Sequence, residues 1–223
     1  MYYKYINISE KEMINMVLCD DIFALNNSVD FLKIYDGKRP YYGGTQSWFK
    51  NSVLRKVGCS IVAAANITAY IAKEMKNKIL YNYDDMSKDN FLDHMESVAK
   101  FIHPDVKKGV TSVSYFDKEV VEFAKDKGVT MQAHMITTED DFENVRLFVK
   151  EGLSKNQPIA LLMLENSTLK EFDWHWMTVT KLFENMDKSY VDFSTWGERR
   201  IFTLEDFYKY SSFGALTYFE DVS

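Results

Sequence analysis

Cysteine, proline and arginine are scarce in this chain. Of its 223 residues only two are cysteine and three proline, while 46% are hydrophobic, 27% charged and 15% aromatic, a composition typical of a globular protein. The net charge is −6, and five arginines among 27 basic residues leave no concentrated basic face for phosphates. The sequence therefore argues against a nucleic-acid partner.

Long apolar runs are also missing. No apolar stretch approaches the roughly 20 residues that a membrane helix needs, because Asn66 interrupts one candidate and Glu165 ends the next. The first residues, MYYKYIN, have no apolar core and run into charged positions, so no signal peptide is expected. We expect a soluble, cytoplasmic protein without a membrane partner, whose two cysteines are free thiols rather than a disulfide.

The chain is long enough to bury one full core, which predicts a single domain over residues 1–223. Ser9 and Glu12 can form a capping box at the start of a segment with apolar periodicity. This segment predicts a helical N-terminal extension over residues 1–36. A glycine-rich loop over residues 36–46 should separate it from the rest.

The remaining pattern predicts an α+β fold. Helical periodicity dominates the first part and strand-like alternation the part after Pro158, an order typical of helices packed on an antiparallel sheet. The expected helices cover residues 60–73, 87–102, 116–127 and 138–152. The expected strands cover residues 129–135, 159–164, 175–183, 189–195, 200–203 and 215–219. The helix over 60–73 is apolar on nearly all faces, so it should lie at the centre.

Cys59 stands at the N-terminus of this central helix. Unpaired backbone N–H groups and the positive end of the helix dipole favour a thiolate there. His175 opens a strand-like segment and is a candidate base, since a neutral imidazole can take the thiol proton and leave a thiolate–imidazolium pair. The two residues together predict a nucleophile for acyl transfer.

Two further groups complete such a site. An oxyanion needs at least two donors, and the Cys59 N–H and the side-chain amide of Gln46, carried by the glycine loop, are the candidates. A third group should orient the imidazole. Asp192 and Ser194 lie two positions apart on the strand after His175, so they share a face and either is a candidate.

These residues resemble the papain-like cysteine peptidases, and within them the bacteriocin-processing double-glycine peptidases. The matching segments are Gln46, Gly58-Cys59-Ser60, His175-Trp176-Met177-Thr178-Val179 and Trp196-Gly197, which occur in the family order. The resemblance covers the chain from about Gly43 to the end. It implies a papain-like fold, with the cysteine helix packed on an antiparallel sheet that carries the histidine, and cleavage of peptide or isopeptide bonds without a metal or cofactor.

The chain departs from the family at three positions. Two residues before the Trp-Gly pair the family usually has Asn or Asp, where this chain has Ser194, an uncharged group that stabilises imidazolium less well. Gln46 precedes Cys59 by 13 residues, a longer interval than in papain. Ser60 stands where many relatives have glycine and narrows the approach to the thiol.

Other sites find little support. His94, His103 and His134 lack zinc-type ligand spacing, which predicts no metal site. Neither a phosphate-binding glycine loop nor a Gly-x-Ser-x-Gly elbow occurs.

The sequence therefore predicts a thiol hydrolase acting on a peptide or protein. Two alternatives stay open: a papain-like binding module without activity, and an amidase or acyltransferase using the same thioester. The oligomeric state is left open.

Overall fold

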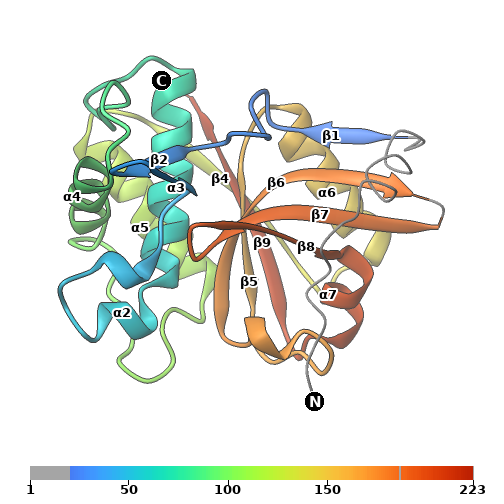
Figure 1. Cartoon of the computed structure of the whole chain (residues 1–223). Coiled ribbons are helices and arrows are strands. Elements are labelled where there is room, and N and C mark those ends of the chain that lie inside the picture. Colours follow the sequence, from blue (N-terminus) through green and yellow to red (C-terminus); the bar gives the residue numbers. More distant parts are fainter. Residues whose placement is uncertain (1–20, 186, 223) are drawn as a thin grey trace.

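The computed structural model describes residues 21–185 and 187–222 (Figure 1). Its strands are β1 (Ile22–Ala24), β2 (Lys33–Asp36), β3 (Arg39–Tyr42), β4 (Met131–Thr137), β5 (Ile159–Met163), β6 (His175–Asn185), β7 (Lys188–Thr195), β8 (Glu198–Thr203) and β9 (Gly214–Asp221). Its helices are α2 (Leu54–Val57), α3 (Cys59–Glu74), α4 (Lys88–Val98), α5 (Val113–Asp126), α6 (Phe142–Ser154) and α7 (Leu204–Tyr210). Two short 3₁₀ turns, η2 (Gln46–Trp48) and η3 (Lys170–Phe172), lie in connecting segments.

The main sheet is antiparallel throughout its described pairs, in the order β4-β9-β5-β6-β7-β8, with β1 pairing the far end of β6. The helices α2 to α5 gather on one side of this sheet, and α6 and α7 lie toward the other (Figure 1). The α+β fold class expected from the sequence, with the cysteine helix packed on an antiparallel sheet, is confirmed.

Helix α3 is the centre of the helical half. Every residue from Cys59 to Ala72 is buried, and α3 contacts β5 and β6 on one side and α4 and α5 on the other. Small residues at many of its positions allow the sheet and the neighbouring helices to approach closely, which explains a helix that is apolar on nearly all faces. The central helix expected over residues 60–73 is confirmed.

The segment before the glycine loop differs from the expectation. Residues 1–20 of the expected helical extension lie outside the described residues, so that part stays a prediction. A helix is wrong for the described remainder, because Ile22–Ala24 is a strand of the main sheet and Lys33–Asp36 pairs with Arg39–Tyr42 in a hairpin. The expected loop over 36–46 thus contains a strand.

The sequence patterns found the other strands but missed the short helices α2 and α7. All the strands expected after Pro158 are present, with ends shifted by up to two residues. Helix α7 is short, and it begins where the Thr203 hydroxyl accepts a hydrogen bond from the Asp206 N–H at 3.2 Å. A Thr-x-x-Asp cap of this kind was available in the sequence.

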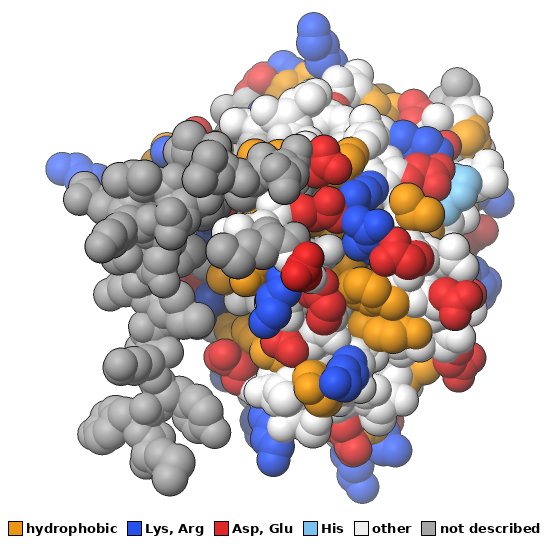
Figure 2. Space-filling model, turned by 90° about the vertical axis from the view of Figure 1, so that its right-hand side faces the viewer, with side chains coloured by type: hydrophobic (Ala, Val, Ile, Leu, Met, Phe, Trp, Pro, Cys, Tyr) orange, Lys and Arg blue, Asp and Glu red, His pale blue; other side chains and the backbone are white. Residues whose placement is uncertain are grey.

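Acidic and basic side chains are interspersed on the face that Figure 2 shows, without a broad area of either sign. The ion pair of Glu184 with Lys150 (2.8 Å) joins β6 to α6, and Glu143 pairs with Arg146 (2.6 Å) within α6. In the part of the chain that the structure describes, no helix is long and apolar enough to cross a membrane.

Candidate active site

Cys59 is the first residue of α3, directly after the N-cap Gly58, which has no side chain to cap the helix. Its side chain is 6% exposed. Burial raises the pKa of the thiol above its usual value, although the backbone N–H groups of Trp176, Ser60 and Cys59 itself act in the opposite direction. The contact with the Trp176 N–H places the thiol beside the start of β6, where His175 lies.

His175 opens β6, pairs with Met163 of β5 and is 7% exposed. Burial lowers the pKa of its imidazole from 6.5 to about 4. Its Nε2 atom lies 2.6 Å from Oγ1 of Thr195, at hydrogen-bond distance. The ring also stacks on Trp196, with ring centres 4.7 Å apart. The imidazole is therefore neutral at neutral pH and is held on two sides.

Cys59 and His175 line one cavity, together with Gln46, Ser194 and Thr195. Its volume is about 10 Å³, roughly the space of a single water molecule. No hydrogen bond between the thiol and the imidazole occurs among those of the described residues. The raised pKa of the thiol and the lowered pKa of the imidazole both favour the neutral pair over the thiolate–imidazolium pair expected from the sequence.

Gln46 reaches this cavity from the turn η2, as expected. Its Nε2 donates hydrogen bonds to the backbone carbonyls of Arg55 (3.0 Å) and Lys56 (3.1 Å), at the end of α2. The long interval between Gln46 and Cys59 thus contains α2, and carbonyl groups of α2 hold the Gln46 amide at the cavity. The two donors of the amide are engaged by these carbonyls rather than free.

Asp192 does not orient His175, which corrects one expectation. Its buried carboxylate is bound by the Arg199 guanidinium, through Nε at 3.1 Å and through a second, shorter bond from Nη2. Asp192 pairs with Lys181 in the middle of the sheet and does not line the cavity. Its charge is neutralised by Arg199, a neighbour that its sequence position did not indicate.

Ser194 lines the cavity but binds elsewhere, which corrects the second expectation. Its hydroxyl donates to the Tyr42 carbonyl at 2.6 Å and accepts from Asn66 Nδ2 at 3.4 Å. Asn66 also accepts from the Gly44 N–H at 2.9 Å and donates to Thr178 Oγ1 at 3.3 Å. Asn66 and Ser194 therefore anchor the loop that carries Gln46.

Position 43 in this loop requires a residue without a side chain. Its φ of +79° is in the left-handed region, and a Cβ built on it would lie 2.4 Å from Ser194 Oγ and 2.9 Å from Asn66 Oδ1. The Gly43 N–H also donates to the Leu32 carbonyl at 2.8 Å. The glycine loop expected to carry Gln46 therefore turns tightly at Gly43 and brings Gln46 to the cavity.

Thr195 is the residue that sequence reasoning missed. It follows Ser194 directly, so strand alternation places it on the opposite face of β7 from Asp192 and Ser194. A signal was present in its position next to Trp196-Gly197, but the face of β7 that meets His175 depends on the pairing with β6. That pairing sets Ser194 opposite Thr178.

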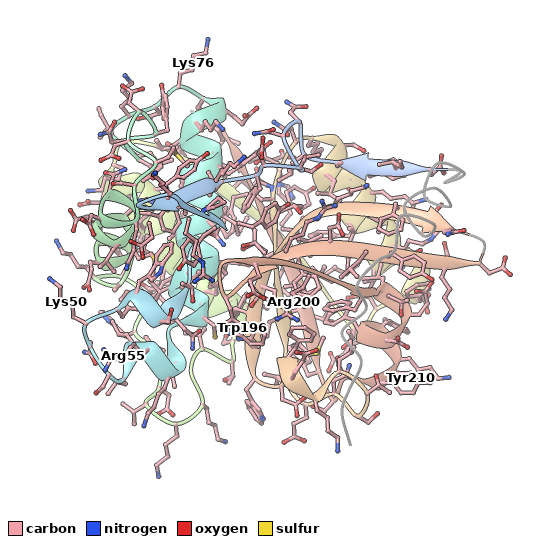
Figure 3. The ribbon with its side chains drawn as sticks, in the orientation of Figure 1. Lys50, Arg55, Lys76, Trp196, Arg200 and Tyr210 are labelled. Carbon is pink, nitrogen blue, oxygen red and sulfur yellow. The ribbon has the colours of Figure 1, made fainter. Side chains whose placement is uncertain are left out.

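Two tryptophans with unusual backbone angles flank the histidine. Trp174 has φ of 55° and Trp196 has φ of 52°, both in the left-handed region, where a bulky residue costs about 1 kcal/mol or more. Trp196 and Gly197 form the two-residue turn between β7 and β8, at the boundary of the helical and sheet halves (Figure 3). Stacking of Trp196 on His175 and on Phe172, at 5.6 Å, offsets its strain.

A second, larger cavity opens beside Trp174. It has a volume of about 460 Å³ and is lined in part by Glu165, Lys170, Asp173 and Tyr210. Trp174 is 39% exposed, and the Lys108 ammonium lies 5.8 Å from the centre of its ring. This open groove adjoins the chain segment that leads into His175.

Metal ligands do not gather in the described residues, where no group of three or more His, Cys, Asp or Glu side chains could hold an ion. His94 is 7% exposed and lies 2.9 Å from Thr68 Oγ1 through its Nε2. It packs against the rings of Tyr81, Phe91 and Phe123. His94 is therefore a buried residue of the core.

Among solved structures, the chain is similar to UfSP from C. elegans, a papain-like cysteine protease, with a TM-score of 0.50 and 8% sequence identity. The match covers 90% of this chain and 34% of the UfSP chain, so the protein spans about a third of that structure's length. No family model and no curated protein matches the chain. At this identity the likeness establishes the papain-like fold alone.

Proposed function

We propose that the protein is a thiol hydrolase, most simply a cysteine peptidase acting on a peptide or protein. The observation that carries the proposal is the cavity shared by Cys59, His175 and Gln46, of which Gln46 and His175 are 129 residues apart in the sequence (175 − 46). A buried thiol at a helix N-terminus beside a buried imidazole is the arrangement that acyl transfer needs. The papain-like fold agrees with it.

The proposed chemistry begins from the neutral pair. As Cys59 Sγ attacks the substrate carbonyl carbon, its proton passes to His175 and the C=O electron pair moves to oxygen. His175 then gives that proton to the amine nitrogen as the C–N bond breaks, which leaves a thioester on Cys59. Water, deprotonated by His175, hydrolyses the thioester and restores the thiol.

The oxyanion in this scheme takes hydrogen bonds from the Cys59 N–H and from Gln46. Gln46 can contribute only after it gives up at least one of its bonds to the Arg55 and Lys56 carbonyls. The cavity of about 10 Å³ also has to widen before a peptide carbonyl can enter. We therefore propose that substrate binding opens the segment from Gln46 to α2.

The main alternative is a papain-like binding module without activity. The specific observation in its favour is the closed, neutral pair, because neither the thiol nor the imidazole is charged at rest. Transfer of the acyl group to an amine instead of water is a variant of the first proposal. It uses the same residues and differs only in the acceptor.

The test is the pH dependence of Cys59 alkylation by a small neutral reagent, measured by mass spectrometry from pH 5 to 10. The Cys19→Ser protein and its His175→Ala derivative are compared. A functional pair predicts faster alkylation of Cys59 with His175 than without it, and hydrolysis of at least one member of a peptide library. Cys59→Ala provides the blank for the library.

Equal alkylation rates with and without His175, together with no cleavage above the Cys59→Ala blank, would contradict the hydrolase and support the binding module. A cleaved library that also gives products joined to an added amine would instead support acyl transfer.

We propose a papain-like thiol hydrolase and no narrower branch of that class. The comparisons give the double-glycine peptidase branch no support, so the substrate is not restricted to that class. The cytoplasmic location and the peptide or protein partner remain predictions from the sequence.

A further inference from the structure

We infer that Thr195 is the positioning residue of His175, in place of the carboxylate or amide expected at Asp192 or Ser194. The inference rests on the proposed function for its catalytic meaning. Thr195 Oγ1 lies 2.6 Å from His175 Nε2, and the two residues are 3% and 7% exposed. Among the described residues, Thr195 is the hydrogen-bond partner of the imidazole.

The other candidate side chains are engaged elsewhere. Asp192 is bound by Arg199, and Ser194 by Tyr42 and Asn66. Asp173, two residues before His175, accepts a hydrogen bond from the Asn166 N–H at 2.7 Å. Thr195 is therefore the group left to orient the ring.

The direction of this bond determines which ring nitrogen acts as the base. A neutral imidazole carries its proton on one nitrogen and accepts on the other. When Nε2–H donates to Thr195 Oγ1, Nδ1 keeps its lone pair and is the atom that receives the Cys59 proton. Trp196 stacks on the ring at 4.7 Å and shields this bond from water.

A hydroxyl differs from a carboxylate in one consequential way. By accepting from Nε2–H it holds the ring and this tautomer in place, but it has no charge to stabilise imidazolium. The resting pair therefore stays neutral, and proton transfer to His175 accompanies the attack on substrate instead of preceding it. Thr195 therefore orients the base while the thiol and the imidazole remain neutral.

Three substitutions at position 195 test the inference. Thr195→Val keeps the shape and removes the hydroxyl, so we expect a fall of about 10-fold to 100-fold in Cys59-dependent turnover, the loss typical of a removed orienting partner. Thr195→Ser should restore most of the rate. Thr195→Asp supplies a charge, so we expect Cys59 alkylation to begin at a lower pH than in the wild type.

Thr180→Val is the matched control. Thr180 is also fully buried and hydrogen-bonded in the sheet, through Tyr42 Oη at 2.8 Å, but it does not line the cavity. It should change stability without shifting the pH profile of Cys59. An unchanged pH profile and rate in Thr195→Val, or the same shift in Thr180→Val, would overturn the inference.

A second readout separates this inference from the proposed function. NMR of the ¹⁵N-labelled protein at pH 7 reports which imidazole nitrogen of His175 carries the proton. We expect Nε2–H in the wild type and in Thr195→Ser, and a mixture of tautomers in Thr195→Val. Nε2–H in all three contradicts the inference, whereas this expected pattern in a protein without turnover contradicts only the hydrolase.

Discussion

Two buried polar clusters lie side by side along the same cavity, and they differ in how completely they are satisfied. Around Asn66, the side chain makes three hydrogen bonds that join α3, β6, β7 and the loop of Gly44. Around His175, the imidazole has one hydrogen-bonded side-chain partner, Thr195, and two tryptophans hold strained backbone angles. The first cluster is built for stability, and the second keeps the strain typical of a functional site.

The comparison predicts that Asn66→Leu has the largest effect on stability. The substitution leaves the buried Gly44 N–H without its acceptor and removes the partner of Thr178 and Ser194, which should cost about 4 kcal/mol. Denaturant unfolding measures the loss. Asn82→Leu, the same change at an exposed position, should cost less than about 0.5 kcal/mol, and equal losses at the two sites would remove the distinction.

The His175 cluster should instead make the stability of the protein depend on pH. The folded protein holds His175 with a pKa of about 4, while the unfolded chain has the usual 6.5, so the unfolded state binds the proton between these values. Stability therefore falls as the pH drops from 6.5 to 4, by about 3 kcal/mol for this group. The unfolding free energies of wild type and His175→Gln are measured at several pH values. The difference between them gives the contribution of His175.

The difference is needed because other buried groups titrate too. Burial lowers the pKa of His94 to about 3, which adds to the acid loss, and raises that of Asp117 to about 7, which opposes it. Both are present in wild type and His175→Gln alike. Parallel stability curves for the two proteins over this window would contradict a neutral, buried His175.

Gly43→Ala should have the next largest effect, about 2 kcal/mol, because the new Cβ meets Ser194 Oγ at 2.4 Å and the φ of +79° disfavours it. Gly37→Ala is the control, since Gly37 has a φ of +60° but nothing within 4 Å of the added Cβ, and should lose only about 1 kcal/mol. Adding Ser194→Ala to Gly43→Ala should recover part of the loss. No recovery would show that the contact is not the cause.

Cys59→Ala should be the mildest change in stability, about 1 kcal/mol or less, because it removes one sulfur atom that is a weak hydrogen-bond acceptor. It should abolish all peptide cleavage. Thermal unfolding measures the change in stability, and the peptide-library assay measures the loss of cleavage. A loss as large as that of Asn66→Leu would place Cys59 among the stabilising core residues.

The course of β7 shows what the sequence could and could not predict about the site. Strand periodicity located β7, and the family order of residues led to its end near Trp196-Gly197. Alternation also showed that Asp192 and Ser194 share a face. Which face meets His175 depends on the pairing of Ser194 with Thr178 and on the bulge between Val179 and Lys181, and one residue of register moves every side chain to the opposite face.

The sequence by itself determined the α+β order, the buried helix that begins at Cys59, the strand that begins at His175 and the glycine turn that brings Gln46 to them. These follow from local periodicity and from backbone preferences that a few residues carry. Only the tertiary structure decided that Thr195 holds the imidazole, that Arg199 neutralises Asp192, and that the thiol and the imidazole rest uncharged. Those features depend on cross-strand register and on burial, which arise only when distant segments pack together.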